Sequence, residues 1–251
     1  VDETTATTLP GTWVRYPGNY GFYEQYSPTR FYYRIDSIVV AGSAGDDTLQ
    51  SAPGVRYQMT SAFYGGDGND LYQLNNAGDL VSEAADSGID TVLSPFTYTL
   101  DNNVENLTLT GNRNIDAICN ALDNLLLGNP ADNIFIGYAG DDTYQFGTSS
   151  GRDQIVDTQG LDAVQLGAGV LLDNLAFFGG TNDLVLKLSD HDRLTITDWY
   201  GGNRIEEFQF DNGSILTADQ VEAIAQIVQP PSVNQQLNDL VVAEDSVFYF
   251  E

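Results

Sequence analysis

Three consecutive nine-residue units at residues 119–145 constrain the fold of this chain more than any other feature of its sequence. They begin at Cys119, Gly128 and Gly137, and each has small or turn-forming residues first and Asp or Asn at its sixth place. A period of nine is too short for a pair of helices and fits one turn followed by one short strand. We expect the eighth-place residues to enter the core: Leu126, Phe135 and Tyr144.

Two further units, at residues 42–50 and 65–73, fit the pattern G-G-x-G-x-D-x-U-x, which is typical of calcium-binding parallel β-helices. A single copy could be an ordinary turn, but several copies in phase favour a repeat array. Glycine at the first, second and fourth places allows sharp turns, and the sixth-place carboxylate and turn carbonyls are hard oxygen ligands that suit Ca²⁺. On these units the chain resembles the haemolysin-type, or RTX, calcium-binding β-roll.

The resemblance implies an all-β fold: a parallel β-roll, which is a two-sheet solenoid of calcium-binding nonapeptide repeats, with a β-rich C-terminal cover and one short helix. We place the roll at residues 41–166 and the cover with its terminal helix at 167–229. Alternating apolar and polar residues predict strands at 184–189, 193–200 and 205–210, in a stretch similar to the segment that follows the repeats in haemolysin-type proteins. A capping box at 217–220 predicts the start of the helix. The cover should bury Trp199, Phe208 and Phe210.

The two ends of the chain differ from the repeats. Residues 1–40 form an aromatic-rich segment with arginines, which we interpret as a cap on the open end of the roll or as a surface that recognises a glycan or a protein. Residues 230–251 begin with two prolines and resemble a linker and the first strand of a cadherin-like module. That resemblance implies a fragment of a larger modular protein.

Acidic residues recur in step with the turns, in an internal duplication in which residues 65–94 parallel residues 137–166. The duplication pairs four acids of each copy: Asp70 with Asp142, Asp79 with Asp153, Glu83 with Asp157, and Asp90 with Asp162. Together with turn residues that offer carbonyl oxygens, these acids make up the predicted metal ligands. The full set is Gly42, Gly45, Asp47, Gly65, Asp67, Gly68, Asp70, Asp79, Glu83, Asp90, Asn124, Asn133, Gly137, Gly140, Asp142, Asp153, Asp157 and Asp162.

The central units carry asparagine at the sixth place, at Asn124 and Asn133. An amide offers an oxygen without a full charge, so ions here should bind weakly or be replaced by asparagine side chains that cap the turns. Turns of a flattened roll alternate between its two edges, so facing ligands should come from units two apart. Asn124 should therefore face Asp142, and Asn133 should face Asp153.

The charge of the chain points to cations as partners. With 36 acidic and 9 basic residues the formal net charge is −27. Nucleic acid and anionic membrane surfaces both need a basic patch, so we expect neither as a partner, and no segment is apolar and long enough to insert into a membrane. We expect several calcium ions as the cofactors, and we predict that the self-repulsion of the chain requires bound ions before it folds.

The sequence offers no recognisable catalytic machinery. His191 is the only histidine and lies in an acidic turn, and there is no P-loop or dinucleotide fingerprint. We therefore predict no enzyme, but a calcium-binding structural module of a large secreted or cell-surface bacterial protein, an RTX adhesin, that folds on Ca²⁺ after type I secretion. The alternatives are a glycan- or protein-recognition module that uses the N-terminal aromatic residues and a secretion-promoting domain of an extracellular hydrolase.

Overall fold

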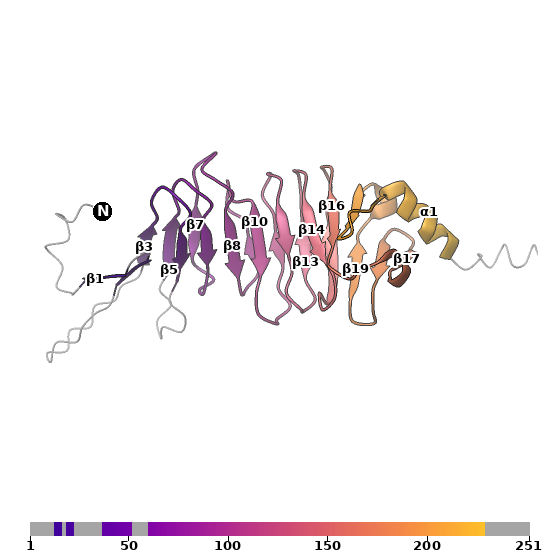
Figure 1. Ribbon diagram of the computed structural model, residues 1–251, viewed down its shortest axis with the longest axis horizontal. Coiled ribbons are helices and arrows are strands. Elements are labelled where there is room, and N and C mark those ends of the chain that lie inside the picture. The colour runs from indigo at the N-terminus through magenta and orange to yellow at the C-terminus, as the bar shows by residue number, and fades with distance from the viewer. Residues whose placement is uncertain (1–12, 17–18, 23–36, 52–59, 229–251) are drawn as a thin grey trace, which may run out of the picture.

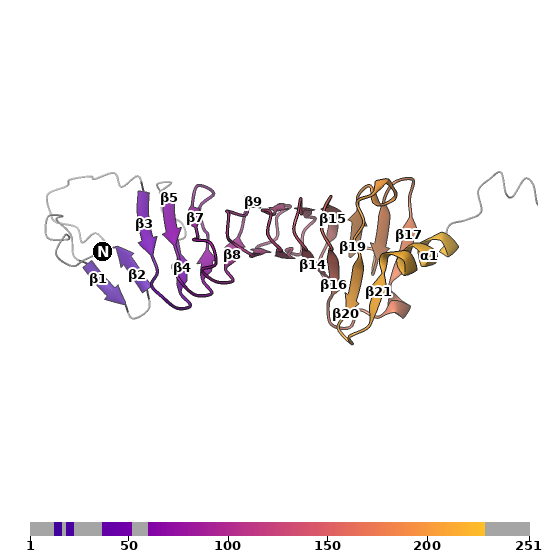
Figure 2. The same cartoon turned by 90° about the horizontal axis from the view of Figure 1, so that it is seen from above.

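The computed structural model describes residues 13–16, 19–22, 37–51 and 60–228. Within them the chain is mostly β, with a parallel β-solenoid of about six turns and one short helix, which confirms the predicted fold class. Figures 1 and 2 show the strands stacked along the long axis of the molecule, with helix α1 (Ala218–Val228) at one end. The predicted cadherin-like strand at 230–251 and the side chains of the N-terminal aromatic segment lie outside the described residues.

One sheet, here called the long sheet, contains nine strands, of which only the last two are consecutive in the chain. Between residues 37 and 166, successive strands of the chain alternate between this sheet and the sheets that face it, as expected for a two-sheet roll. In spatial order the long sheet consists of β4 (Thr48–Gln50), β6 (Leu71–Gln73), β8 (Thr91–Ser94), β10 (Asn106–Leu109), β12 (Leu125–Leu127), β14 (Thr143–Phe146), β16 (Ala163–Leu166), β20 (Glu207–Phe210) and β21 (Ile215–Thr217).

Two facing sheets, of three and seven strands, lie opposite the long sheet. The first consists of β3 (Ser37–Ala41), β5 (Thr60–Tyr64) and β7 (Leu80–Ser82). The second runs through β9 (Tyr98–Thr99), β11 (Ala117–Ile118), β13 (Ile134–Ile136), β15 (Arg152–Val156), β19 (Arg193–Ile196), β18 (Leu184–Lys187) and β17 (Ala176–Gly179). Two short strands near the N-terminus, β1 (Trp13–Tyr16) and β2 (Asn19–Phe22), form a separate antiparallel pair.

The core consists of inward-facing side chains that the coils contribute from both sheets. In the repeat strands the middle residue is buried and its neighbours point outward, so the eighth-place residues of the nonapeptides enter the core as predicted. Because the parallel pairing is in register, eight buried side chains of the long sheet lie directly above one another. They are Leu49, Tyr72, Val92, Leu107, Leu126, Tyr144, Val164 and Phe208.

The C-terminal segment continues the roll before closing it. β19 pairs in parallel with β15 and β20 pairs in parallel with β16, so both sheets extend into the segment that the sequence analysis assigned to the cover. Antiparallel strands complete both sheets: β18 and β17, which precede β19 in the chain, extend the facing sheet beyond β19, and β21 extends the long sheet beyond β20. The short 3-10 helices η2 (Leu172–Asn174) and η3 (Trp199–Gly201) make the connections.

Aromatic packing and a capped helix close this end of the roll. Trp199, Phe208 and Phe210 are buried as predicted, and the Phe208 ring lies 6.1 Å from Trp199 and 6.0 Å from Phe177, centroid to centroid. Helix α1 starts with the expected capping box, in which the Thr217 N–H donates to Gln220 at 2.9 Å and the Gln220 N–H donates to Thr217 at 3.4 Å. Within the described part of the chain, no helix has the length and hydropathy needed to cross a membrane.

Candidate metal centres

An acid or an asparagine directly precedes each of the first eight strands of the long sheet. At six of these positions the side chain accepts a hydrogen bond from the backbone N–H of the corresponding residue one coil earlier: the Asp70 N–H donates to Asp90 at 2.8 Å, and the Asp142 N–H donates to Asp162 at 2.9 Å. Asp47 and Asn124 instead accept N–H groups of their own turns. This edge ladder consists of Asp47, Asp70, Asp90, Glu105, Asn124, Asp142, Asp162 and Glu206, with further such bonds into Asp70, Glu105, Asp142 and Glu206.

A second row of the same kind lies at the opposite edge. The Ser61 N–H donates to Asp79 at 2.8 Å, and the Asn133 N–H donates to Asp153 at 3.0 Å. The predicted neighbours Asn124 and Asp142, and Asn133 and Asp153, therefore do meet. One carboxylate oxygen of these acids thus ties adjacent coils together, which leaves the other oxygen for a different partner.

Two groups of three carboxylates form at the first edge. The first cluster is Asp70, Glu83 and Asp90, and the second cluster is Asp142, Asp157 and Asp162. Within each cluster one oxygen from every carboxylate lies within 4.8 Å of the others. The two clusters occupy equivalent places in the internal duplication. Glu83 and Asp157 are paired in it, and each lies with the sixth-place acid that follows it and with the sixth-place acid one coil earlier. Three of the four duplicated acid pairs are thus brought together, whereas Asp79 and Asp153 lie at the other edge.

The first cluster contains four buried oxygen atoms that have no hydrogen-bond partner among the described residues. They are Asp70 Oδ2, Glu83 Oε1, Asp90 Oδ2 and the Tyr72 hydroxyl. Burial raises the pKa of all three carboxyl groups, and the charges of neighbouring acids raise it further. Buried like charges without a counterion are strongly unfavourable, so the cluster needs protons or a bound cation.

The second cluster is partly satisfied by protein donors. The Tyr144 hydroxyl donates to Asp157 Oδ2 at 2.5 Å, and the Thr158 N–H donates to Asp157 Oδ1 at 2.6 Å. Asp142 Oδ2 is buried and has no partner within the described structure. Burial, together with nearby acids, raises the pKa of Asp142 to about 7 and that of Asp162 to about 8. In the part of the chain that the structure describes, the ion pairs involve Asp190, Asp219 and Glu222, so no Lys or Arg neutralises either cluster there.

Beside both clusters, other side chains approach the backbone so closely that only glycine fits. A β-carbon on Gly65 would collide with Asp70, Glu83 and Tyr72, and one on Gly137 would collide with Tyr144 and Asp157. At these two repeats the acids can therefore converge only because the first place carries no side chain. Cys119, which stands where glycine is usual, is buried beside the second cluster, as its small size allows; burial, followed by the charge of Asp142, raises the pKa of its thiol.

The other predicted ligands shape the turns. Gly45, Gly68 and Gly140 have φ values of 113°, 127° and 112°, which favour glycine, and the Gly45 N–H donates to the Asp67 carbonyl. The side chain of Asp67 is exposed and joins neither cluster. The Asp47 carboxylate accepts from the N–H of Ser43 at 2.6 Å, within its own turn. Gly42 is held by a hydrogen bond from its N–H to the Tyr64 carbonyl at 2.7 Å.

The two asparagines use their amide groups to satisfy backbone carbonyls. Asn124 Nδ2 donates to the carbonyls of Val104 and Glu105 at 3.2 and 3.1 Å, and Asn133 Nδ2 donates to that of Ile115 at 2.7 Å. The side-chain amide thus takes the carbonyl oxygens that a cation would otherwise share, as the capping interpretation of these turns predicts.

Two members of the edge ladder and the tyrosines beside the clusters were not predicted from the sequence. Glu105 and Glu206 accept the N–H groups of Asp90 and Asp162 at 2.7 and 2.8 Å, although their turns lack the glycine pattern. Their signal is positional, since each is the last residue before a strand. Tyr144 was assigned to the core, and its ring does lie there, as does that of Tyr72 at the same place of the unit at residues 65–73. The Tyr144 hydroxyl donates to Asp157, and the Tyr72 hydroxyl lies beside Asp70 and Glu83 without a hydrogen bond in the described structure.

Comparison with known proteins gives one family match and two relatives. Residues 183–220 match the haemolysin-type calcium binding protein related domain. The endo-1,3-1,4-beta-glycanase ExsH of Rhizobium meliloti (strain 1021) is 36% identical over 102 residues, 41% of this chain and 19% of that protein. The endo-1,3-1,4-beta-glycanase EglC of the same organism is 31% identical over 181 residues, 62% of this chain and 36% of that protein.

The chain therefore spans about a fifth of one of these curated relatives and about a third of the other. The family match lies at the C-terminal end of the roll and covers β18, β19, β20, β21 and the start of α1. Taken with the parallel solenoid and its paired acidic clusters, the match supports an RTX-like β-roll.

Proposed function

We propose that this chain is a non-catalytic, calcium-binding structural module of a secreted protein, and that it completes its fold only when calcium occupies the two clusters. The observation that carries the proposal is the set of buried carboxylate oxygens without a partner in the described structure, at Asp70, Glu83, Asp90 and Asp142. An unpaired buried charge costs several kcal/mol, whereas a divalent cation converts the same oxygens into ligands.

The donor set selects calcium among the common cations. Each cluster offers carboxylate oxygens, and the adjoining turns offer backbone carbonyls. Ca²⁺ accepts six to eight such oxygens in flexible geometry, whereas Mg²⁺ keeps several of its waters and Zn²⁺ prefers nitrogen and sulfur. Asp70, Glu83 and Asp90 would hold one ion, and Asp142, Asp157 and Asp162 would hold another, so that binding energy becomes folding energy.

The parent protein is best sought among extracellular hydrolases. Both relatives described above are named as glycanases, which favours the secretion-promoting module of a hydrolase over the adhesin that the sequence alone suggested. Since the chain spans only a part of each relative, this role does not require any catalytic group in the chain itself. The adhesin and the N-terminal recognition surface depend on residues 230–251 and 1–40, and both stay predictions.

Circular dichroism under calcium titration tests the proposed function. We expect weak β signal in excess chelator near neutral pH and a cooperative gain of signal on adding Ca²⁺, with little gain at the same concentration of Mg²⁺. Isothermal titration should then show ion binding coupled to a large folding enthalpy. A β signal that is already complete in chelator, with no thermal stabilisation by calcium, would falsify the proposal.

A further inference from the structure

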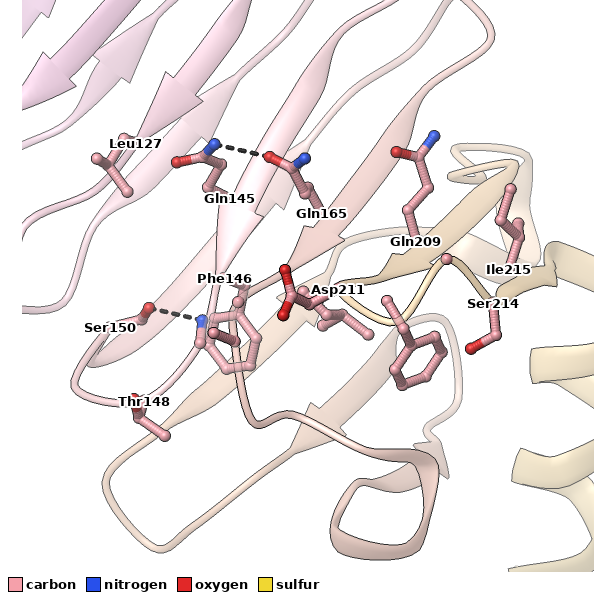
Figure 3. A pocket seen from close by; sticks show the side chains of 16 residues that line it. Leu127, Gln145, Phe146, Thr148, Ser150, Gln165, Gln209, Asp211, Ser214 and Ile215 are labelled. Carbon is pink, nitrogen blue, oxygen red and sulfur yellow. Dashed lines mark hydrogen bonds between the residues drawn. The ribbon is translucent and has the colours of Figure 1, made fainter.

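A groove of about 670 Å³ crosses the outer face of the long sheet at its C-terminal end (Figure 3). Its lining includes a row of glutamines, Gln145 on β14, Gln165 on β16 and Gln209 on β20, which are paired in register across the parallel strands. The apolar residue after each glutamine, Phe146, Leu166 and Phe210, lines it as well. Gln145 Nε2 donates to Gln165 Oε1 at 2.7 Å, and Gln209 Nε2 donates to Glu207 at 2.9 Å. We call this feature the glutamine groove.

The row offers alternating hydrogen-bonding groups to a ligand. Among the described residues, no protein group bonds to Gln165 Nε2 or to the Oε1 atoms of Gln145 and Gln209, so one free donor lies between two free acceptors. Parallel strands are spaced by about 4.8 Å, so these amides repeat evenly along the axis of the roll. Leu127 and Ile215 continue the row at its two ends and are 38% and 49% exposed.

The charge of the groove contrasts with that of the chain. Asp211 is the only charged residue among those that line it, although the chain carries 36 acids. Hydroxyl groups of Thr148, Ser150 and Ser214 lie along the sides. Small residues, among them Gly147, Gly167 and Ala168, keep the groove open. A polyanion would be repelled by the surrounding acidic surface, and a cation would find more carboxylate at the turns.

We propose that the glutamine groove binds a neutral, hydroxyl-rich polysaccharide chain that lies along the roll axis, across the strands. Sugar hydroxyls both donate and accept hydrogen bonds, as the amides of the row do, and the apolar faces of sugar rings suit Leu127 and Ile215 at its ends. This site is separate from the calcium clusters, which lie at the edge of the roll, and it does not involve the N-terminal aromatic segment.

Isothermal titration of the calcium-loaded chain with matched hexasaccharides tests the proposal. We expect cellohexaose or laminarihexaose to bind and hexagalacturonate, which has the same length but carries carboxylates, to bind at least about tenfold more weakly. Gln165→Leu should weaken binding of the neutral sugar by about tenfold, whereas Gln73→Leu should change it by less than about twofold. Gln73 is the matched control, because it and Gln145 both hold the ninth place of their repeats and Gln73 lies outside the groove.

A second measurement covers the case in which a variant folds poorly. In the unaltered chain, the side-chain amide resonances of Gln145, Gln165 and Gln209 should shift on addition of the neutral sugar, and that of Gln73 should not. Binding of neither neutral sugar, or unmoved groove amides in the folded chain, would overturn the proposal. So would a Gln165→Leu variant that loses thermal stability but keeps full affinity, because the row would then serve only as a structural ladder.

Discussion

Each sixth-place acid that belongs to one of the two clusters has two tasks that fall on different oxygens. In Asp90, Oδ1 accepts the N–H of Asp70 from the coil before it, while Oδ2 points into the first cluster without a partner there. In Asp142, Oδ1 accepts the N–H of Asn124 in the same way. An asparagine at these positions could keep the first task and lose the charge needed for the second, so the two tasks can be separated by substitution.

Asp142→Asn should therefore have opposite effects with and without calcium. In chelator the variant should be more stable than the unaltered chain, since one buried charge is gone, while the calcium concentration at its folding midpoint should rise by about tenfold or more. Circular dichroism under calcium titration measures both. Asp86→Asn is the control, because Asp86 is exposed and has φ 59°, which asparagine tolerates. Equal midpoints for the two variants would remove Asp142 from the ion site.

The two cluster tyrosines should differ although they hold equivalent places in the duplication. Tyr144→Phe removes the donor to Asp157 and leaves a buried acceptor unsatisfied, which should lower the free energy of unfolding by about 1–3 kcal/mol in calcium. Tyr72→Phe removes a hydroxyl without a partner in the described structure and should cost less than about 1 kcal/mol. Urea unfolding measures both values. Equal losses would show that the Tyr72 hydroxyl contacts the ion or an acid.

The sequence predicted the acids of the clusters but not how they are grouped. Pattern and duplication identified Asp70, Glu83 and Asp90, and the alternation of turns predicted the meeting of Asn124 with Asp142. Other features depend on distances that no spacing encodes. The position of each tyrosine hydroxyl depends on how deeply its ring lies in the core. The Asp47 carboxylate is not available to a cluster because it accepts the N–H of Ser43 within its own turn.

At the scale of elements, glycine at the first place of a repeat determines whether a turn can form a cluster. A β-carbon at Gly137 would overlap with the Tyr144 hydroxyl and the Asp157 carboxylate. Gly147 offers a matched comparison in the following loop, since its added β-carbon would lie 3.4 Å from the nearest atom, Gly167 Cα, which is ordinary contact.

Gly137→Ala should thus destabilise the calcium-bound chain by about 1–3 kcal/mol, as overpacking in a rigid site does, and should raise the calcium midpoint. Gly147→Ala should change the free energy of unfolding by less than about 1 kcal/mol. Thermal unfolding in saturating calcium, followed by titration, distinguishes the two. If both variants behave alike, the close approach at Gly137 is relieved by a shift of the turn.

At the C-terminal end of the roll, the parallel pairing of strands continues beyond the nonapeptide repeats of the sequence. The nonapeptide rhythm ends near residue 166, yet β19 and β20 still pair in parallel with β15 and β16. The chain reaches them through longer connections that include β17 and β18, so the spacing of strands along the sequence changes while their spacing in the sheet does not. Alternation of apolar residues predicted these strands, whereas their partners could not be predicted from period nine.

At the scale of the whole molecule, the buried carboxyl groups of the metal-free fold are either protonated, or ionised at a cost in folding free energy. Burial raises the pKa of Asp142 and Asp153 to about 7 and that of Asp162 to about 8, far above the value of about 3.9 for an unfolded chain. At pH values between the unfolded and the folded pKa, the folded state binds more protons than the unfolded state. The stability of the metal-free fold is therefore greatest at acidic pH and is lost as the pH rises through the folded pKa values.

We accordingly expect the metal-free chain to be more stable at about pH 5 than at about pH 8, with a loss on the order of 1 kcal/mol per pH unit for each such carboxyl group. Excess calcium should flatten this dependence, because the ion replaces the protons, and the calcium midpoint should rise as the pH falls. Urea unfolding in chelator at several pH values measures the slope. Asp162→Asn should reduce this slope by the contribution of one carboxyl group. A metal-free chain that gains stability from pH 5 to pH 8 would mean that these carboxylates ionise in the fold without penalty, and calcium would then have no buried charge to neutralise.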